Sequence, residues 1–132
     1  MPIVTGELTP SQRIILALDV DRIEQALLHV LEIGDAVGMF KIGLQMLANS
    51  GPSVFAEIMQ KHSRARFFYD AKFHDIPLIV EAAAKNSGRL PGIEFVSIHA
   101  SAGKDAMARA ARACPHVKFL AITALTSLSD EE

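Results

Sequence analysis

Short, almost wholly apolar runs recur along the chain, and longer segments with helical spacing separate them. Runs of this kind, without alternating polar positions, are typical of strands that are covered on both faces. We predict strands at 13–19, 39–43, 65–70, 95–99 and 118–124. The marker residues Ile14, Met39, Phe67, Phe95 and Phe119 are 25, 28, 28 and 24 residues apart, so the strands recur at a nearly constant interval.

Apolar residues three and four positions apart fill the intervals between these runs. They predict helices around 23–31, 54–59, 79–84 and 104–113. Pro77 opens the third of these, and Gly34 and Gly88 follow the first and the third, as expected for helix starts and stops. Strands that alternate strictly with helices in this way predict a parallel sheet.

Two parallel architectures compete, an open doubly wound sheet and a closed (β/α)8 (TIM) barrel. The first strand is followed by Asp19-Val20-Asp21-Arg22, without the glycine-rich turn of dinucleotide-binding open sheets. Polar residues instead gather at the carboxyl ends of the strands: Asp19, Lys41, Asp70 with Lys72, His99 with Ser101, and Thr123 with Thr126. Such positions meet at the mouth of a barrel, where barrel active sites lie, so we predict the TIM-barrel family.

The length fits only part of such a barrel. A complete one takes about 250 residues, whereas 132 residues provide roughly the first four βα units and the fifth strand. We interpret residues 1–12, with two prolines, as a loose leader and 13–132 as the N-terminal part of one barrel domain. Ser129 and Glu132 have the spacing of a capping box, which announces a further helix, so we expect the chain to be truncated.

Composition and charge limit the classes of partner that the protein is expected to bind. Half of the residues are hydrophobic, the formal net charge is −2, and Lys and Arg do not cluster, so neither nucleic acid nor an anionic membrane is expected as a partner. The apolar runs fall far short of the roughly 18 residues of a membrane-spanning helix. The single cysteine, Cys114, excludes an internal disulfide, and with no visible secretory signal the cytoplasm is the expected location.

The densest polar feature is the segment 70–77, Asp-Ala-Lys-Phe-His-Asp-Ile-Pro. Residues two apart in a strand point the same way, so Asp70 and Lys72 should project together, with Asp75 in the turn beyond. Lys41 on the neighbouring strand should complete an alternating Lys, Asp, Lys, Asp array, in which each cation lowers the pKa of the carboxylates. The alternative is an ordinary surface ion-pair cluster. Contributions from two strand ends and a turn favour a catalytic site with charges fixed in advance.

These residues also resemble a known family. The segments ALDV, FKIG, DAKFHDIP, VSIHAS and AITALTS resemble, in order and spacing, the orotidine 5′-monophosphate decarboxylase family from about Arg13 to the end of the chain. The resemblance implies decarboxylation of orotidine 5′-monophosphate to uridine 5′-monophosphate, the last step of de novo pyrimidine biosynthesis. It also implies that no metal or organic cofactor is used, and that the protein is a homodimer with shared active sites.

The resemblance assigns roles to individual residues. Asp19 would bind the ribose, and Lys41 would join the charged network and reach the sugar. Asp70 would face the substrate carboxylate, and Lys72 would deliver a proton to C6 of the pyrimidine. Thr126 would contact the pyrimidine.

A second group of residues lies in and after the turn that follows Lys72. Asp75 would reach into the partner's site, and Ile76 and Ile79 match further positions that contact the substrate. The family commonly has Asn-Thr after Asp-Ile-Pro, whereas this chain has Leu78-Ile79, so the threonine hydroxyl is missing. The family binds the substrate phosphate with a Gly-Arg pair after the last strands of the barrel, and no such segment is present in these 132 residues.

Two alternatives remain. Sugar-phosphate enzymes of the same superfamily share the Asp-x-Lys-x-x-Asp motif but hold Mg²⁺ with a Glu after the second strand. In this sequence that position is Lys41, whose charge repels a metal. The other alternative is a catalytically inactive half barrel, whether a fragment or an interaction module.

Overall fold

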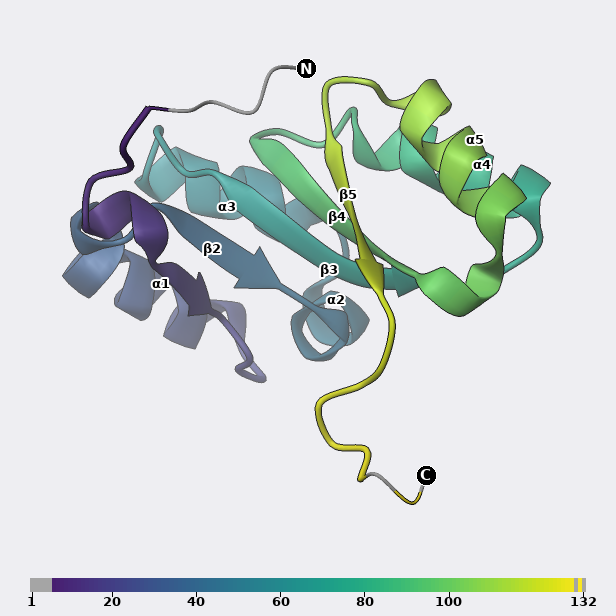
Figure 1. Ribbon diagram of the computed structural model, residues 1–132. Helices are drawn as coiled ribbons and strands as arrows, with labels where there is room; N and C mark the ends of the chain where they lie inside the picture. Colours follow the sequence, from purple (N-terminus) through teal and green to yellow (C-terminus); the bar gives the residue numbers. More distant parts are fainter. Residues whose placement is uncertain (1–5, 130, 132) are drawn as a thin grey trace.

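Five parallel strands lie side by side in chain order, β1-β2-β3-β4-β5, in a single sheet (Figure 1). The structure is a computed structural model that describes residues 6–129 and 131. The strands are β1 (Ile15–Ala17), β2 (Met39–Ile42), β3 (Phe67–Phe73), β4 (Ile93–His99) and β5 (Lys118–Ile122). Each connection moves one strand along the sheet, and right-handed crossovers of this kind place successive helices on the same face.

The helices alternate with the strands as predicted. They are α1 (Ile23–Ile33), α2 (Leu44–Ser50), α3 (Ser53–Lys61), α4 (Pro77–Ser87) and α5 (Lys104–Ala113), with 3-10 turns η1 (Ser11–Arg13), η2 (Gly34–Ala36) and η3 (Ala100–Ala102). None of the helices within the described residues is long and apolar enough to cross a membrane.

The largest differences from the sequence prediction are at β1, β3 and α2. β1 is shorter than predicted, and β3 continues to Phe73 rather than ending at Asp70. Helix α2 was not predicted at all. It has only seven residues and ends at Ser50; Gly51, which follows with a φ of 66°, turns the chain toward α3. Two turns of helix are too few to show a 3.6-residue period, so the pattern could not reveal it.

The main core lies between the sheet and helices α1 to α3. Its largest members are fully buried aromatic and aliphatic side chains, among them Phe40, Phe55, Ile58 and Phe67. The rings of Phe55 and Phe67 meet edge to face with centroids 5.2 Å apart. Because burying each such side chain contributes about 1.5–3 kcal/mol, this layer fixes the strands that carry the polar residues.

A second, smaller core joins α4 and α5 to β4. Ala84, Ala106 and Ala110 are completely buried there, together with Val80 and Ile98. The alanines allow the two helices to pack closely against each other.

The sheet is open at β1 and β5, which each pair with one neighbour only among the described residues. Apolar side chains are partly exposed on these edge strands, with Ile15 44% and Leu120 37% exposed. After β5 the chain runs away from the sheet (Figure 1). The predicted capping box depends on Glu132, which lies outside the described residues, and the boundary of the leader at residue 12 stays a prediction.

Candidate active site

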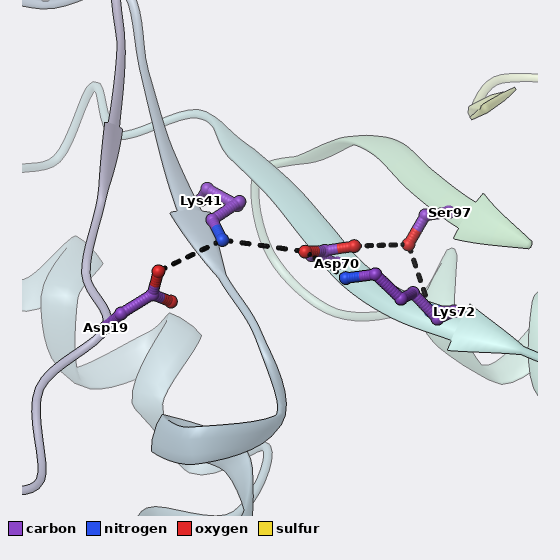
Figure 2. Close-up of polar contacts among 5 residues, drawn as sticks. All are labelled: Asp19, Lys41, Asp70, Lys72 and Ser97. Carbon is purple, nitrogen blue, oxygen red and sulfur yellow. Dashed lines mark hydrogen bonds and ion pairs between the residues drawn. The ribbon is translucent and has the colours of Figure 1, made fainter. Parts of the chain in front are cut away.

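Four charged side chains form a continuous line at the carboxyl ends of the first three strands (Figure 2). Nζ of Lys41 lies 3.1 Å from Oδ2 of Asp19 and 3.5 Å from Oδ2 of Asp70. Nζ of Lys72 donates a hydrogen bond of 2.7 Å to the same Oδ2 of Asp70. The charges therefore alternate in the order Asp19, Lys41, Asp70, Lys72, and one oxygen of Asp70 lies between the two ammonium groups.

The register of the sheet explains this alignment. Ala17 is paired with Lys41, and Lys41 with Phe68. Asp19 and Asp70 lie two residues beyond Ala17 and Phe68, so both carboxylates reach the level just above the side chain of Lys41. Parallel strands end at one edge of the sheet, which is why residues far apart in the chain converge here.

Asp70 is the most buried member of the line, with its side chain 10% exposed. Burial by itself would raise the pKa of Asp70, because it disfavours the charged carboxylate. Hydrogen bonds from Lys72 and Ser97, together with the charges of Lys72 and Lys41, outweigh burial, so the pKa lies below its ordinary value. Asp70 is therefore a carboxylate at neutral pH.

Strand β3 is irregular where it carries Lys72. Tyr69 pairs with Val96, and the next pair is Phe73 with Ile98, so three residues of β3 face one residue of β4. Lys72 has a φ of 48°, which is rare for a residue with a side chain and strained there. Asp70 and Lys72 do meet as predicted, but an irregular strand brings them together rather than a regular two-residue period.

Ser97 is the residue of β4 opposite this irregularity, and it is not among the site residues predicted from the sequence. It is fully buried. Its Oγ donates to Oδ1 of Asp70 at 2.7 Å and accepts the backbone N–H of Lys72 at 2.9 Å (Figure 2). The available signal was a polar side chain inside the otherwise apolar run Val96 to Ile98, two residues before His99.

A pocket of about 460 Å³ opens beside the charged line. Lys41, Asp70 and Lys72 supply its charged wall, and Phe68 and Ile122 are among its apolar lining residues. Thr126, from the segment after β5, also lines it. The structure thus brings together five of the predicted site residues, since Asp19 contacts this wall through Lys41.

The other predicted site residues lie elsewhere. Oδ1 of Asp75 accepts the backbone N–H of Ile76 at 2.7 Å, and among the described residues Asp75 has no ion pair with the charged line. It lines a separate recess with Ile76 at the start of α4. Ile76 and Ile79 are 62% and 48% exposed. The expected Lys, Asp, Lys, Asp array therefore has Asp19, not Asp75, as its second carboxylate within one chain.

The fold and the site define the class of protein: consecutive βα units of a parallel barrel with a charged site at the carboxyl ends of the strands. The family model described as "Orotidine 5'-phosphate decarboxylase / HUMPS family" matches residues 12–132. The chain belongs to this family.

Individual relatives agree with the family match. The chain is 41% identical over 130 residues to an orotidine 5′-phosphate decarboxylase of Syntrophomonas wolfei, covering 92% of this chain and 53% of the relative. It is 39% identical over 129 residues to one from Synechocystis sp., covering 95% and 54%. The chain thus spans about half the length of the curated relatives that it matches.

Solved structures resemble the fold. An orotidine 5′-phosphate decarboxylase structure from Lactobacillus acidophilus is 34% identical, with a TM-score of 0.75 over 89% of this chain and 55% of that one. One from Pyrococcus horikoshii OT3, 22% identical, has a TM-score of 0.70 over 80% of this chain and 48% of that one, a likeness of fold. The five strands are therefore part of a (β/α)8 barrel, as predicted.

Proposed function

We propose that this chain contributes the catalytic charges of an enzyme that decarboxylates orotidine 5′-monophosphate to uridine 5′-monophosphate. The observation that carries the proposal is the position of one oxygen of Asp70 between the ammonium groups of Lys41 and Lys72, at the wall of a pocket. The family and the names of the relatives support the same reaction.

The geometry suits the proposed chemistry. The bond between C6 and the carboxylate carbon breaks, carbon dioxide leaves, and the electron pair stays on C6. The ammonium of Lys72 then gives a proton to C6, so the base that remains is the neutral amine. Asp70 faces the substrate carboxylate, and this repulsion disappears as carbon dioxide forms. The cation of Lys72 stabilises the charge that develops on C6.

Substrate binding is divided over two groups of residues in this proposal. Asp19 and Lys41 bind the ribose, and Thr126 contacts the pyrimidine. Asp75, Ile76 and Ile79 act from the partner chain of a homodimer, and their exposure at the start of α4 leaves them available for such contact. We place the enzyme in the cytoplasm, which fits its single, buried and free cysteine.

The magnesium-dependent sugar-phosphate reaction is the competing candidate. Its metal would need a carboxylate at the position of Lys41, where the structure has an ammonium group paired with two carboxylates. A positive charge at this place opposes a divalent cation. No organic or metal cofactor is therefore part of the proposal.

The test uses a barrel of full family length, made by joining this chain to the C-terminal half of the Syntrophomonas wolfei relative. We expect it to decarboxylate orotidine 5′-monophosphate, followed by the loss of substrate absorbance, at the same rate with and without EDTA. Activity that disappears on chelation and returns with Mg²⁺ would favour the sugar-phosphate reaction. Absence of decarboxylation by a folded, dimeric barrel would contradict the proposal.

A further inference from the structure

We propose that Ser97 is the positioning residue of this site, whose single hydroxyl fixes both the orientation of Asp70 and the backbone of Lys72. The inference rests on the proposed decarboxylase function. Ser97 is not among the site residues predicted from the sequence.

The first step concerns the two oxygens of Asp70. Oδ1 accepts the hydroxyl of Ser97 at 2.7 Å, whereas Oδ2 accepts Lys72 and lies 3.5 Å from Nζ of Lys41. The hydrogen bond from Ser97 therefore holds Oδ1 of Asp70 toward β4 and leaves Oδ2 facing the two ammonium groups. Without this hydrogen bond, the carboxylate could rotate about its last bond and exchange its two oxygens.

The second step concerns the backbone. Because three residues of β3 face one residue of β4, the sheet ladder is interrupted at Lys72. The N–H of Lys72 donates instead to Oγ of Ser97 at 2.9 Å. A buried N–H without a partner is costly, so this contact satisfies the donor and holds Lys72 at its φ of 48°.

The third step joins the two contacts. A hydroxyl has one hydrogen to donate and two lone pairs with which to accept. Ser97 uses the hydrogen for Asp70 and a lone pair for Lys72, so the proton donor and the carboxylate share one fixed reference point on β4. A buried serine with both functions in use is rigid, because β4 pairs with strands on both sides.

The test compares Ser97→Ala with Ser87→Ala in the full-length barrel. Ser87 is a matched control because it is also buried, at 4% exposure, and its hydroxyl donates only to the carbonyl of Ala83 within α4. For Ser97→Ala we expect kcat to fall by about a hundredfold, as for a small misplacement of reacting groups, with KM changed little. Ser97→Thr, which keeps a hydroxyl, should recover much of the activity, and Ser87→Ala should match the wild type.

A second measurement does not depend on turnover. Hydrogen exchange of the Lys72 amide, followed by NMR, should be about tenfold faster in Ser97→Ala because its acceptor is lost, and unchanged in Ser87→Ala. If Ser97→Ala does not fold, Ser97→Cys keeps the volume with a weaker donor and should show the same two changes in smaller measure.

The outcomes separate the two proposals. Wild-type kcat in folded Ser97→Ala, or equal losses of activity and stability in both alanine variants, would overturn the role of Ser97. Unchanged exchange at Lys72 would do so even if the wild-type barrel lacked decarboxylase activity. Faster exchange in a barrel that is inactive on orotidine 5′-monophosphate would instead refute the proposed function.

Discussion

Lys72 is the charged residue with the most constrained conformation. Its backbone has a left-handed φ, and its side chain forms an ion pair with Asp70. Its ammonium is 2.7 Å from Oδ2 of Asp70, and its side chain is 29% exposed toward the pocket. In the proposed mechanism, this exposed part gives the proton to the substrate. The residue thus combines a fixed partner on one side with access to the pocket on the other.

Replacement of Lys72 gives the first prediction. In the full-length barrel, Lys72→Ala should lower kcat by at least about a thousandfold, because removal of one preorganised donor already costs a hundredfold or more. The fold should persist, since the side chain emerges at the mouth of the barrel. Lys85→Ala, on the exposed side of α4, is the matched control and should keep normal turnover. Near-normal turnover in Lys72→Ala would remove Lys72 from the mechanism.

Asp70 gives a prediction about pH. Its pKa is lowered in the folded state, so the unfolded chain binds the proton first when the pH falls below the ordinary value of about 3.9. The stability that Asp70 contributes is present above that pH and is lost as the pH falls toward the folded pKa. In the full-length barrel, the difference in free energy of unfolding between wild type and Asp70→Asn, measured by urea denaturation, should therefore shrink below about pH 4. A difference that is constant from pH 7 to pH 2 would contradict the lowered pKa.

At the scale of elements, the ends of α1 and α4 form a natural comparison. Both helices are followed by a glycine with right-handed helical φ, Gly34 at −57° and Gly88 at −68°. The surroundings differ. A Cβ at Gly88 would lie 2.1 Å from Sγ of Cys114, whereas at Gly34 the nearest atom is 3.5 Å away. The backbone at Gly88 lies close to Cys114, the residue that follows α5. Glycine is therefore required at Gly88 by the packing of α4 against α5 and not by its backbone conformation.

Alanine substitutions at these two glycines give the third prediction. Gly88→Ala should lower the free energy of unfolding by about 1–3 kcal/mol, because the added methyl group overpacks a filled core. Gly34→Ala should be neutral or stabilise by up to about 1 kcal/mol, because alanine restricts the unfolded chain. Chemical denaturation of both variants in the full-length barrel measures the difference. Equal effects at the two positions would contradict this account of the contact between α4 and α5.

At the scale of the whole molecule, the open edges of the sheet are the feature that most favours association with other chains. β1 and β5 carry exposed apolar side chains and leave backbone groups unpaired, which favours association with other chains. The resemblance also implies that the family's phosphate-binding pair follows the last strands of the barrel, whereas this chain spans about half the length of its relatives. In the proposed mechanism, binding of the remote phosphate offsets the cost of placing a carboxylate against Asp70.

The fourth prediction follows for the 132-residue polypeptide alone. It should be inactive and should associate or aggregate, as measured by size-exclusion chromatography with light scattering. Ile15→Lys with Leu120→Lys should reduce this association, because lysine at sheet edges opposes pairing. Activity should return when the C-terminal half is supplied in the same chain or separately. Tight binding of uridine 5′-monophosphate by a monodisperse 14.3 kDa monomer would contradict this prediction.

The fifth prediction concerns the proposed dimer. If Asp75 acts across the interface, inactive Asp75→Asn and inactive Lys72→Ala full-length subunits should regain some activity when mixed. One of the two sites in each mixed dimer would then have both wild-type residues. When equal amounts of the two subunits exchange freely, about half of the dimers are mixed and one of the two sites in each is intact. The mixture should therefore approach about a quarter of the wild-type activity. No recovery, with subunit exchange shown by mass spectrometry, would place Asp75 and Lys72 in the same chain's site.

The order of the elements and the convergence of the charged residues could be predicted from local patterns in the sequence. Apolar runs at a regular interval require parallel strands, and parallel strands end at one edge, so the convergence of Asp19, Lys41, Asp70 and Lys72 could be predicted. Helix α2 was not predicted because it is too short to show a helical period. Strand β3 was predicted to end at Asp70 because polar residues follow it.

Tertiary structure alone decided how those charges are held. The role of Ser97 depends on which residue of β4 lies opposite the irregular stretch of β3, and no pattern within either strand specifies that register. The same holds for Asp75, which the sequence places five residues after Asp70 but whose carboxylate contacts the backbone at the start of α4. Local sequence determines which residues can form a strand or turn, whereas contacts between distant strands depend on the packing of the whole sheet.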